Sequence, residues 1–258
     1  MRALVTGAGA RLGQQMALYL GCRGYDVAVH YHGSADGAAD TVAQLQAMGR
    51  IAVSFQADLL NEDETLALLP AAARALGGPI TVLINNASLF EYDNIETASR
   101  TSWDRHIGSN LRAPFMLTQA LAAQAPDADV DAVGEPVASS LVVNMLDQRV
   151  HKLTPEFMTY TIAKMGLWAF TQTAAQALAP RVRVNGIGPG PTLQGHQQSK
   201  IHFDKQRQAT ILERGVNPSD INAALGYFLD ARAVTGQMLA VDGGQHLAWK
   251  TPDILGIE

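Results

Sequence analysis

The stretch VTGAGARLG, residues 5–13, decides the fold because it joins an apolar run to a helical one through three glycines. Gly7 and Gly13 permit a tight turn and close backbone approach, and the start of the next helix offers unpaired N–H groups to a phosphate. A glycine turn alone is weak evidence, but one that follows a strand and opens a helix is typical of nucleotide sites. The stretch therefore predicts a strand–turn–helix unit that binds the phosphates of a cofactor.

Apolar runs and alanine-rich helical stretches alternate along the rest of the chain. We expect strands at residues 2–6, 26–31, 51–56, 81–86, 140–146, 181–187 and 236–241, and helices near 12–23, 36–48, 62–76, 100–124, 155–178 and 218–230. The strand runs are mostly continuous in apolar residues, which suits a parallel sheet covered on both faces. The alternation predicts an α/β fold: one doubly wound, Rossmann-type domain over residues 1–258, with a mostly parallel seven-stranded sheet and helices on both faces.

The composition of the chain argues against several classes of protein, including nucleic-acid-binding, disulfide-bonded and membrane proteins. The formal net charge of -5 gives no basic surface for nucleic acid. Cys22 is the only cysteine, which excludes an intramolecular disulfide and fits a reducing compartment. We see no apolar run of membrane-spanning length and no signal-peptide pattern at the N-terminus. We expect a cytoplasmic protein that binds neither nucleic acid nor membrane.

Two segments fall outside the strand–helix pattern. Residues 125–139 are acidic, and their alternating aspartates imitate the start of a calcium loop. Ala132 and Ala138 stand where such a loop needs glycine and glutamate, so we expect a surface loop and no metal site. Residues 188–210 begin with glycine and proline and continue with polar residues. A long segment of this kind after a sheet strand is often a lid over a binding site, so we expect a substrate loop there.

The stretch TPEFMTYTIAK, residues 154–164, carries a candidate acid–base pair at the start of a long helix. Thr154 fits the N-cap, and Pro155 fits the first helical position. Tyr160 and Lys164 are four residues apart and share one helix face. A nearby ammonium group stabilises a phenolate and lowers the pKa of the phenol from about 10, so Tyr160 can exchange protons while Lys164 tunes it.

Together, the glycine turn and this pair make the chain resemble the short-chain dehydrogenase/reductase family over essentially its whole length. The resemblance rests on residues 6–13, Asp58, NNA at 85–87, Asn110, Tyr160 with Lys164, GPG at 188–190 and DGG at 242–244. It implies that Lys164 holds the nicotinamide ribose and that Asn110 holds a water in a proton relay behind Lys164. The cofactor contacts that it implies are Gly7, Arg11, Leu12, His30, Tyr31, His32, Ser34, Asp58, Leu59, Asn86, Ala87, Ser109, Lys164, Pro189, Gly190 and Thr192.

Asp147 departs from the family pattern, which usually has a serine at this position. An ionised carboxylate would repel the alkoxide that forms during ketone reduction. Hydride addition to a C=N bond instead leaves a nitrogen that must take a proton. Asp147 beside Tyr160 could relay that proton, and it could accept hydrogen bonds from an amino-heterocycle. We therefore expect Asp147, Tyr160, Lys164 and Asn110 to be the catalytic residues.

One subgroup of the family has this arrangement: the chain is similar to the pteridine reductases and the related short-chain dihydromonapterin or dihydrofolate reductases. The similarity rests on Arg11, on residues 30–34, 86–90 and 108–110, and on the aspartate in residues 144–147. It implies that Phe90 stacks a pterin against the nicotinamide. The substrate contacts that it implies are Arg11, Ser88, Phe90, Asp147 and Tyr160.

The end of the second predicted strand indicates the cofactor. An NAD-selective site usually has an acid there for the ribose 2′-hydroxyl, whereas residues 30–34 read HYHGS. No carboxylate would repel a 2′-phosphate, and Arg11 could pair with the phosphates, so NADPH is favoured over NADH. Gly33 stands where pteridine reductases tend to carry a basic residue, which leaves the strength of this preference open.

The leading hypothesis is an NADPH-dependent reductase of a pterin-type C=N bond, from a dihydropterin or dihydrofolate to the tetrahydro form. A ketone or alcohol oxidoreductase of the same family is the alternative. A non-catalytic NADP-binding sensor would be expected to lose Tyr160 or Lys164. The helix over residues 160–179 is apolar almost all round, which predicts a covering partner subunit and a homotetramer or homodimer.

Overall fold

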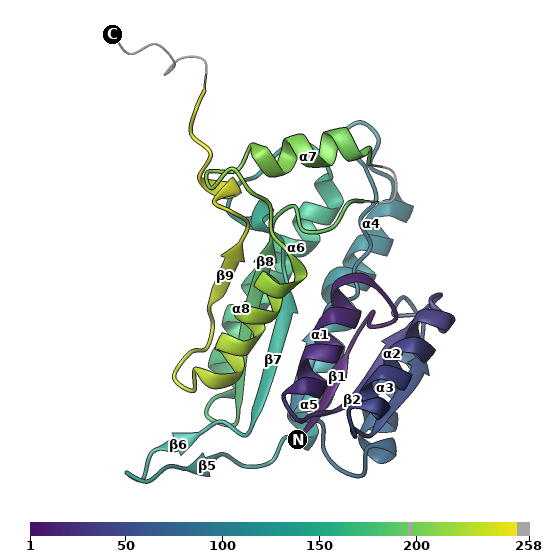
Figure 1. Ribbon diagram of the computed structural model, residues 1–258, viewed down its shortest axis with the longest axis vertical. Coiled ribbons are helices and arrows are strands. Elements are labelled where there is room, and N and C mark those ends of the chain that lie inside the picture. The colour runs from purple at the N-terminus through teal and green to yellow at the C-terminus, as the bar shows by residue number, and fades with distance from the viewer. Residues whose placement is uncertain (196–197, 252–258) are drawn as a thin grey trace.

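Seven parallel strands form the central sheet of the computed structural model, which describes residues 1–195 and 198–251 (Figure 1). The sheet order is β3-β2-β1-β4-β7-β8-β9, and each adjacent pair is parallel. The strands are β1 (Arg2–Val5), β2 (Asp26–Tyr31), β3 (Ala52–Gln56), β4 (Val82–Asn85), β7 (Ser140–Met145), β8 (Val182–Pro189) and β9 (Met238–Val241). The order reverses between β1 and β4. Ligands of open α/β sheets bind at such a reversal, outside the carboxyl ends of the strands.

Helices cover both faces of this sheet, which confirms the predicted doubly wound α/β fold. Helices α1 (Arg11–Cys22), α2 (Ala35–Ala47) and α8 (Pro218–Asp230) pack into one apolar cluster, as Met16, Leu45 and Phe228 illustrate. Helices α3 (Glu62–Ala75), α5 (Ala113–Gln124) and α6 (Met158–Leu178) pack into the other. Burying both faces explains why the strands read as continuous apolar runs. No helix within residues 1–195 and 198–251 is both long and apolar enough to cross a membrane.

Two predicted helices differ from the structure. The predicted helix over 100–124 is divided into α4 (Arg100–Ile107), a π-helical turn (Gly108–Arg112) and α5. The predicted helix over 155–178 begins later, at Met158, so Thr154 is not its N-cap. Both changes occur beside the site described below, where local rules of helix formation compete with tertiary contacts.

The two segments outside the strand–helix pattern have some regular structure of their own. In the acidic segment, β5 (Asp129–Val130) and β6 (Pro136–Val137) form an antiparallel pair. Asp131 closes their turn by accepting hydrogen bonds from the N–H groups of Val133 and Glu135. The predicted substrate loop contains α7 (Lys200–Gln208), and its residues 196–197 lie outside the described residues. The remaining short elements are 3₁₀ turns at Gln148–Val150 and Gln245–Leu247.

Candidate active site

The glycine turn after β1 requires glycine for two separate reasons. Gly7 has a φ of 65°, in the left-handed region that favours glycine. A Cβ on Gly13 would overlap the carbonyl oxygen of Gly7 and would lie 2.6 Å from Asn86 Nδ2. Asn86 in turn donates from Nδ2 to the Thr6 carbonyl at 2.8 Å, which ties the end of β4 to the turn. The turn is therefore fixed in shape before a cofactor binds.

The side chain of His30 holds this turn in place through hydrogen bonds. It is buried, its Nδ1 accepts a hydrogen bond from the Gly7 N–H at 3.0 Å, and its Nε2 lies 3.1 Å from the Ala57 carbonyl oxygen. Because a backbone N–H can only donate, the ring carries its proton on Nε2 and is neutral. Burial lowers the pKa of His30 and so favours this neutral form. His30 therefore holds the phosphate turn in place, and its predicted contact with the cofactor stays a prediction.

The residues that follow β2 line an open rim. His32, Gly33 and Ser34 are exposed, and Tyr31 is partly buried. A Cβ on Gly33 would meet no described atom within 4 Å, so the space beside it is open. The neighbouring strand end contributes Asp58, whose Oδ1 accepts the N–H of Leu60 at 2.9 Å. These residues leave room for the adenosine end of a dinucleotide at the carboxyl edge of the sheet.

A second group of predicted cofactor residues follows β8. Gly190 donates its N–H to the Val241 carbonyl at 2.8 Å, and a Cβ on it would lie 2.6 Å from Asp242 Cα. Thr192 is buried and bonds the Gly190 carbonyl at 3.0 Å. Pro189 ends β8 itself. The structure therefore brings these residues to the same sheet edge as the phosphate turn, with Leu12 packed on the apolar core beneath it.

Arg11 joins the phosphate turn to the segment after β8. Its φ is 54°, which a non-glycine residue adopts only at some cost. Its guanidinium donates from Nη1 to the Gln194 carbonyl at 3.0 Å and from Nη2 to the Leu193 carbonyl at 3.3 Å. Arg11 would have to leave these carbonyls to contact the substrate or a cofactor phosphate, as the sequence predicts.

Asp147 and Tyr160 meet where β7 ends against α6. The Tyr160 hydroxyl donates to Asp147 Oδ2 at 2.8 Å, and Asp147 Oδ1 accepts the Arg149 N–H at 2.8 Å. Lys164, one helical turn after Tyr160, donates from Nζ to the Met145 carbonyl at 2.7 Å. Its Nζ lies 5.7 Å from the centroid of the Tyr160 ring. Asp147, Tyr160 and Lys164 thus meet in one polar cluster, as the sequence predicts, with Tyr160 and Lys164 buried and Asp147 partly buried.

Burial controls the protonation of this cluster. It raises the pKa of Asp147, and the hydrogen bonds from Arg149 and Tyr160 oppose the shift without cancelling it. Burial and the negative charge of Asp147 raise the pKa of Tyr160 well above its usual value. Burial lowers the pKa of Lys164 to about 8. The net shift of the Tyr160 pKa is therefore upward and is set by burial and Asp147, and the expected lowering by Lys164 stays a prediction.

An aromatic shelf borders the Tyr160 hydroxyl. The Phe90 ring is stacked on Phe157 with centroids 4.3 Å apart, and its edge contacts Tyr160 at 4.7 Å. Phe90 is 54% exposed, so a large part of it faces solvent. The Arg149 guanidinium lies 4.9 Å from the Phe157 centroid, and Tyr92 packs edge-on against Phe157. This shelf offers a flat apolar surface beside proton-carrying groups, which suits a planar heterocycle.

Sequence reasoning missed Phe157, Arg149 and Tyr92. Phe157 gave no usable signal, because it lies just before α6 in a left-handed conformation, outside the helical spacing to Tyr160. Arg149 follows Asp147 by two residues, as its N–H bond to that carboxylate requires. Tyr92 had no comparable signal, because the segment that carries it has no regular structure.

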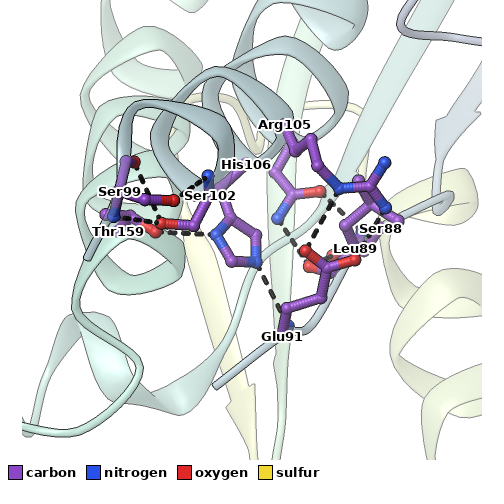
Figure 2. A network of polar contacts seen from close by, with 9 residues as sticks. Ser88, Leu89, Glu91, Ser99, Ser102, Arg105, His106 and Thr159 are labelled. Atoms are coloured by element: carbon purple, nitrogen blue, oxygen red, sulfur yellow. Dashed lines mark hydrogen bonds and ion pairs between the residues drawn. The ribbon is translucent and has the colours of Figure 1, made fainter. Parts of the chain in front are cut away.

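The segment after β4 carries Ser88 and Phe90, and Asn110 holds it in place. Asn110 is fully buried in the π-helical turn, accepts the Leu89 N–H at 2.8 Å, and donates from Nδ2 to the Leu89 carbonyl at 2.8 Å. Ser88 faces the Tyr160 hydroxyl and lowers the pKa of that phenol in a minor way. Figure 2 shows Ser88 and Leu89 beside Arg105. Asn110 thus fixes the segment after β4, and the predicted water behind Lys164 stays a prediction.

Comparisons with known proteins match nearly the whole chain. A family model described as enoyl-(acyl carrier protein) reductase covers residues 7–246. The structure of FolM alternative dihydrofolate reductase 1 from Brucella canis, complexed with NADP, is 41% identical with a TM-score of 0.90, covering 98% of this chain and 96% of that chain. Pteridine reductase 1 from Leishmania tarentolae is 30% identical, covering 95% of this chain and 96% of that protein. The 3-oxoacyl-[acyl-carrier-protein] reductase FabG from Staphylococcus epidermidis is 28% identical, covering 95% and 98%.

These matches agree with the geometry of the site. The phosphate turn after β1, the Tyr160–Lys164 pair at the start of α6 and the parallel sheet order all lie where the resemblance in the sequence predicts them. The chain therefore belongs to the short-chain dehydrogenase/reductase family.

Proposed function

We propose that this protein is an NADPH-dependent reductase that adds hydride to a C=N bond of a dihydropterin or dihydrofolate and yields the tetrahydro form. The observation that carries the proposal is the 2.8 Å hydrogen bond from the Tyr160 hydroxyl to Asp147 Oδ2. It places a carboxyl group beside the phenol, which suits protonation of a ring nitrogen better than stabilisation of an alkoxide. The Brucella and Leishmania relatives, whose names are those of dihydrofolate and pteridine reductases, support the same substrate class.

The residues of the sheet edge fit NADPH. The close packing at Gly13 leaves the backbone of the turn accessible to a phosphate, and the exposed residues 32–34 after β2 contain no carboxylate that would repel a 2′-phosphate. We propose that Lys164, Asn86 and Pro189 lie along the nicotinamide half and that His32 and Ser34 lie along the adenosine half. When bound, the nicotinamide supplies the hydride.

The protein's own part in the reaction is to hold the substrate and to supply a proton. We propose that Phe90 stacks on one face of the pterin and that Ser88 and Asp147 bind its polar edge. The raised pKa of Asp147 and the protonated Tyr160 keep a proton within one hydrogen bond of the ring nitrogen that becomes basic. The phenol can donate this proton, and Asp147 can replace it.

Turnover of a small substrate panel tests this function. NADPH oxidation is followed with dihydrobiopterin, dihydromonapterin, dihydrofolate and a set of ketones, and the series is repeated with NADH. We expect turnover of at least one dihydropterin or dihydrofolate, little with the ketones, and a preference for NADPH. Ketone turnover without pterin turnover would contradict the proposal and support the alternative oxidoreductase. NADPH binding without any turnover would support a sensor.

We also propose that the protein assembles as a homotetramer or homodimer through α5 and α6. Phe115 on α5 and Ile162 on α6 are each 42% exposed, and Met165 lies one turn nearer the end of α6 with 37% exposed. Phe115 packs against Phe170 of α6 at 5.0 Å, so the two helices present one apolar surface. A second copy would bury this surface. The cytoplasmic location expected from the sequence stays a prediction.

A further inference from the structure

A chain of hydrogen bonds runs from α4 to the two segments that build the site (Figure 2). The Glu91 N–H donates to His106 Nε2 at 3.1 Å, and His106 Nδ1 lies 2.7 Å from Thr159 Oγ1. The Thr159 hydroxyl donates to Asp93 Oδ2 at 2.5 Å. Glu91 and Asp93 lie on the segment after β4, His106 lies in α4, and Thr159 lies in the first turn of α6. These hydrogen bonds therefore connect the segment after β4 with the first turn of α6 through the buried His106.

The direction of every hydrogen bond in this chain is determined. A backbone N–H only donates, so His106 Nε2 must accept and the neutral ring must carry its proton on Nδ1. The Nδ1–H group donates a hydrogen bond to Thr159 Oγ1, and the Thr159 hydroxyl donates its own hydrogen bond to Asp93 Oδ2. Burial lowers the pKa of His106, while Asp93 and Glu91 oppose this shift and Arg105 adds to it. The neutral ring is thus the form that burial favours and that the hydrogen bond from the Glu91 N–H requires.

Asp93 is the anionic end of the chain. Burial would raise the pKa of Asp93, but hydrogen bonds from Thr159 and Ser102 outweigh it and hold that pKa below its usual value. Asp93 Oδ1 also accepts the Thr159 N–H at 3.1 Å, and the Asp93 carbonyl accepts the Met158 N–H at 3.3 Å. These two N–H groups belong to the first turn of α6, where the helix dipole favours a negative charge.

The hydrogen-bond chain ends next to both Phe90 and Tyr160 of the proposed site. Phe90 lies between Leu89, whose N–H is held by Asn110, and Glu91, whose N–H is held by His106. Tyr160 directly follows Thr159, and its ring centroid lies 6.0 Å from that of His106. A shift of His106 would therefore move the stacking ring and the phenol relative to each other.

We propose that His106, Thr159 and Asp93 are positioning residues, which set the distance between the Phe90 ring and the Tyr160 hydroxyl for the reaction. The inference rests on the proposed function, because it takes Phe90 as the stacking residue and Tyr160 as the proton donor. None of the three contacts the substrate itself. Their effect is on geometry, and misplacement of a reacting group by about 1 Å costs on the order of a hundredfold in rate.

Removal of one hydroxyl group tests the proposal. Thr159→Val keeps the shape of the side chain and breaks both its hydrogen bonds, whereas Thr159→Ser keeps the hydroxyl. Thr173→Val is the matched control, because Thr173 lies on the same helix, is exposed, and bonds only to carbonyls of its own helix. We expect kcat with a dihydropterin to fall about tenfold or more in Thr159→Val, and to stay within about threefold of wild type in Thr159→Ser and Thr173→Val. The NADPH Kd should be unchanged in all three.

Amide hydrogen exchange of the protein without substrate gives a second readout that does not depend on turnover. We expect faster exchange in residues 88–93 in Thr159→Val and wild-type rates there in Thr173→Val, because the Glu91 N–H loses a fixed partner.

If Thr159→Val does not fold, His106→Gln takes its place, since its amide oxygen can keep the Glu91 bond while the Thr159 bond is lost. Equal kinetics of Thr159→Val and wild type, or equal losses in Thr159→Val and Thr159→Ser, would overturn the proposal. A wild-type enzyme without pterin turnover would overturn the proposed function instead, and the exchange rates would still decide whether the segments are coupled.

Discussion

Asp147 shows how one buried carboxyl group can favour one reaction over another. Its raised pKa arises because burial disfavours the charged form more than the bonds from Arg149 and Tyr160 favour it. When Asp147 takes up a proton, this carboxyl group and the neighbouring phenol can pass protons to a ring nitrogen, whereas the ionised carboxylate would repel an alkoxide. The residue that is costly for stability is therefore the one that fits reduction of a C=N bond.

The pH dependence of turnover follows from this protonation. The pair supplies its proton only while Asp147 is protonated, so kcat/KM for a dihydropterin should fall as the pH rises through the raised pKa of Asp147. Initial rates between about pH 5 and 9 measure this profile. Asp147→Asn has no acidic proton and should give a low and flat profile. A wild-type profile that rises with pH would contradict this role.

Lys164 should make the stability of the protein depend on pH in the alkaline range. Its pKa is lowered from 10.5 to about 8 in the folded protein, so between these values the unfolded chain binds more protons. Stability therefore rises with pH from about 8 to 10.5, and the cost of burying the ammonium, on the order of 3 kcal/mol, is fully present below pH 8. Lys164→Met removes this dependence, which urea unfolding at several pH values can measure. A constant difference between wild type and Lys164→Met across this range would contradict the lowered pKa.

The chemistry of single residues was predictable where it depended on spacing along the chain. Tyr160 and Lys164 share a helix face, and Asp147 follows a strand, so all three could be placed from the sequence. The direction of the pKa shift of Tyr160 could not be predicted, because it depends on burial and on a carboxylate from another element. His30 shows the same limit: its position after β2 was clear, but its burial beneath the turn was not.

At the scale of elements, the start of α6 shows how a distant residue overrides a local rule. Thr154 and Pro155 have the right types and spacing for a helix start. The helix begins instead at Met158, where Asp93 accepts the Thr159 N–H and the Asp93 carbonyl accepts the Met158 N–H. Asp93 lies far from α6 in the sequence, so no local pattern could have indicated this cap. Phe157, directly before this start, has a left-handed conformation with φ 55°.

The phosphate turn is the element whose glycines can be tested most cleanly. Gly13→Ala should weaken NADPH binding by about tenfold or more and lower stability by about 1–3 kcal/mol, because the new Cβ would overlap the Gly7 carbonyl oxygen and press on Asn86. Gly33→Ala is the control for folding stability, since a Cβ there meets open space. NADPH titration by fluorescence and thermal unfolding measure the two effects. NADPH binding by Gly13→Ala as tight as that of wild type would contradict the close backbone approach at Gly13.

The whole molecule was predictable because both faces of its sheet are buried. Continuous apolar strands alternating with helices allow few arrangements other than a parallel doubly wound sheet, and the observed order confirms it. The short β5–β6 pair was not predicted, because two-residue strands leave too little pattern in an acidic segment. The oligomeric state could not be derived from a single chain, although the apolar surface of α5 and α6 favours an oligomer.

Assembly is tested by adding one charge to that surface. Ile162→Glu should dissociate the oligomer, because a carboxylate would be buried without a partner in the interface. Ile201→Glu is the control: the same change on α7, where the side chain is 71% exposed and lies away from α5 and α6. Light scattering of wild type and both variants gives the mass. A monomeric wild type across a wide concentration range would contradict the proposed oligomer.

The central claim, that Asp147 directs this enzyme to a C=N bond, is tested most directly by Asp147→Ser in the NADPH oxidation assay. Serine restores the residue that the family usually has at this position, so the site loses its carboxyl proton donor while the phosphate turn is untouched. We predict that kcat/KM with the dihydropterin or dihydrofolate substrate falls by about a hundredfold or more, while the NADPH Kd stays within about twofold of wild type. Unchanged pterin turnover by Asp147→Ser would contradict the account.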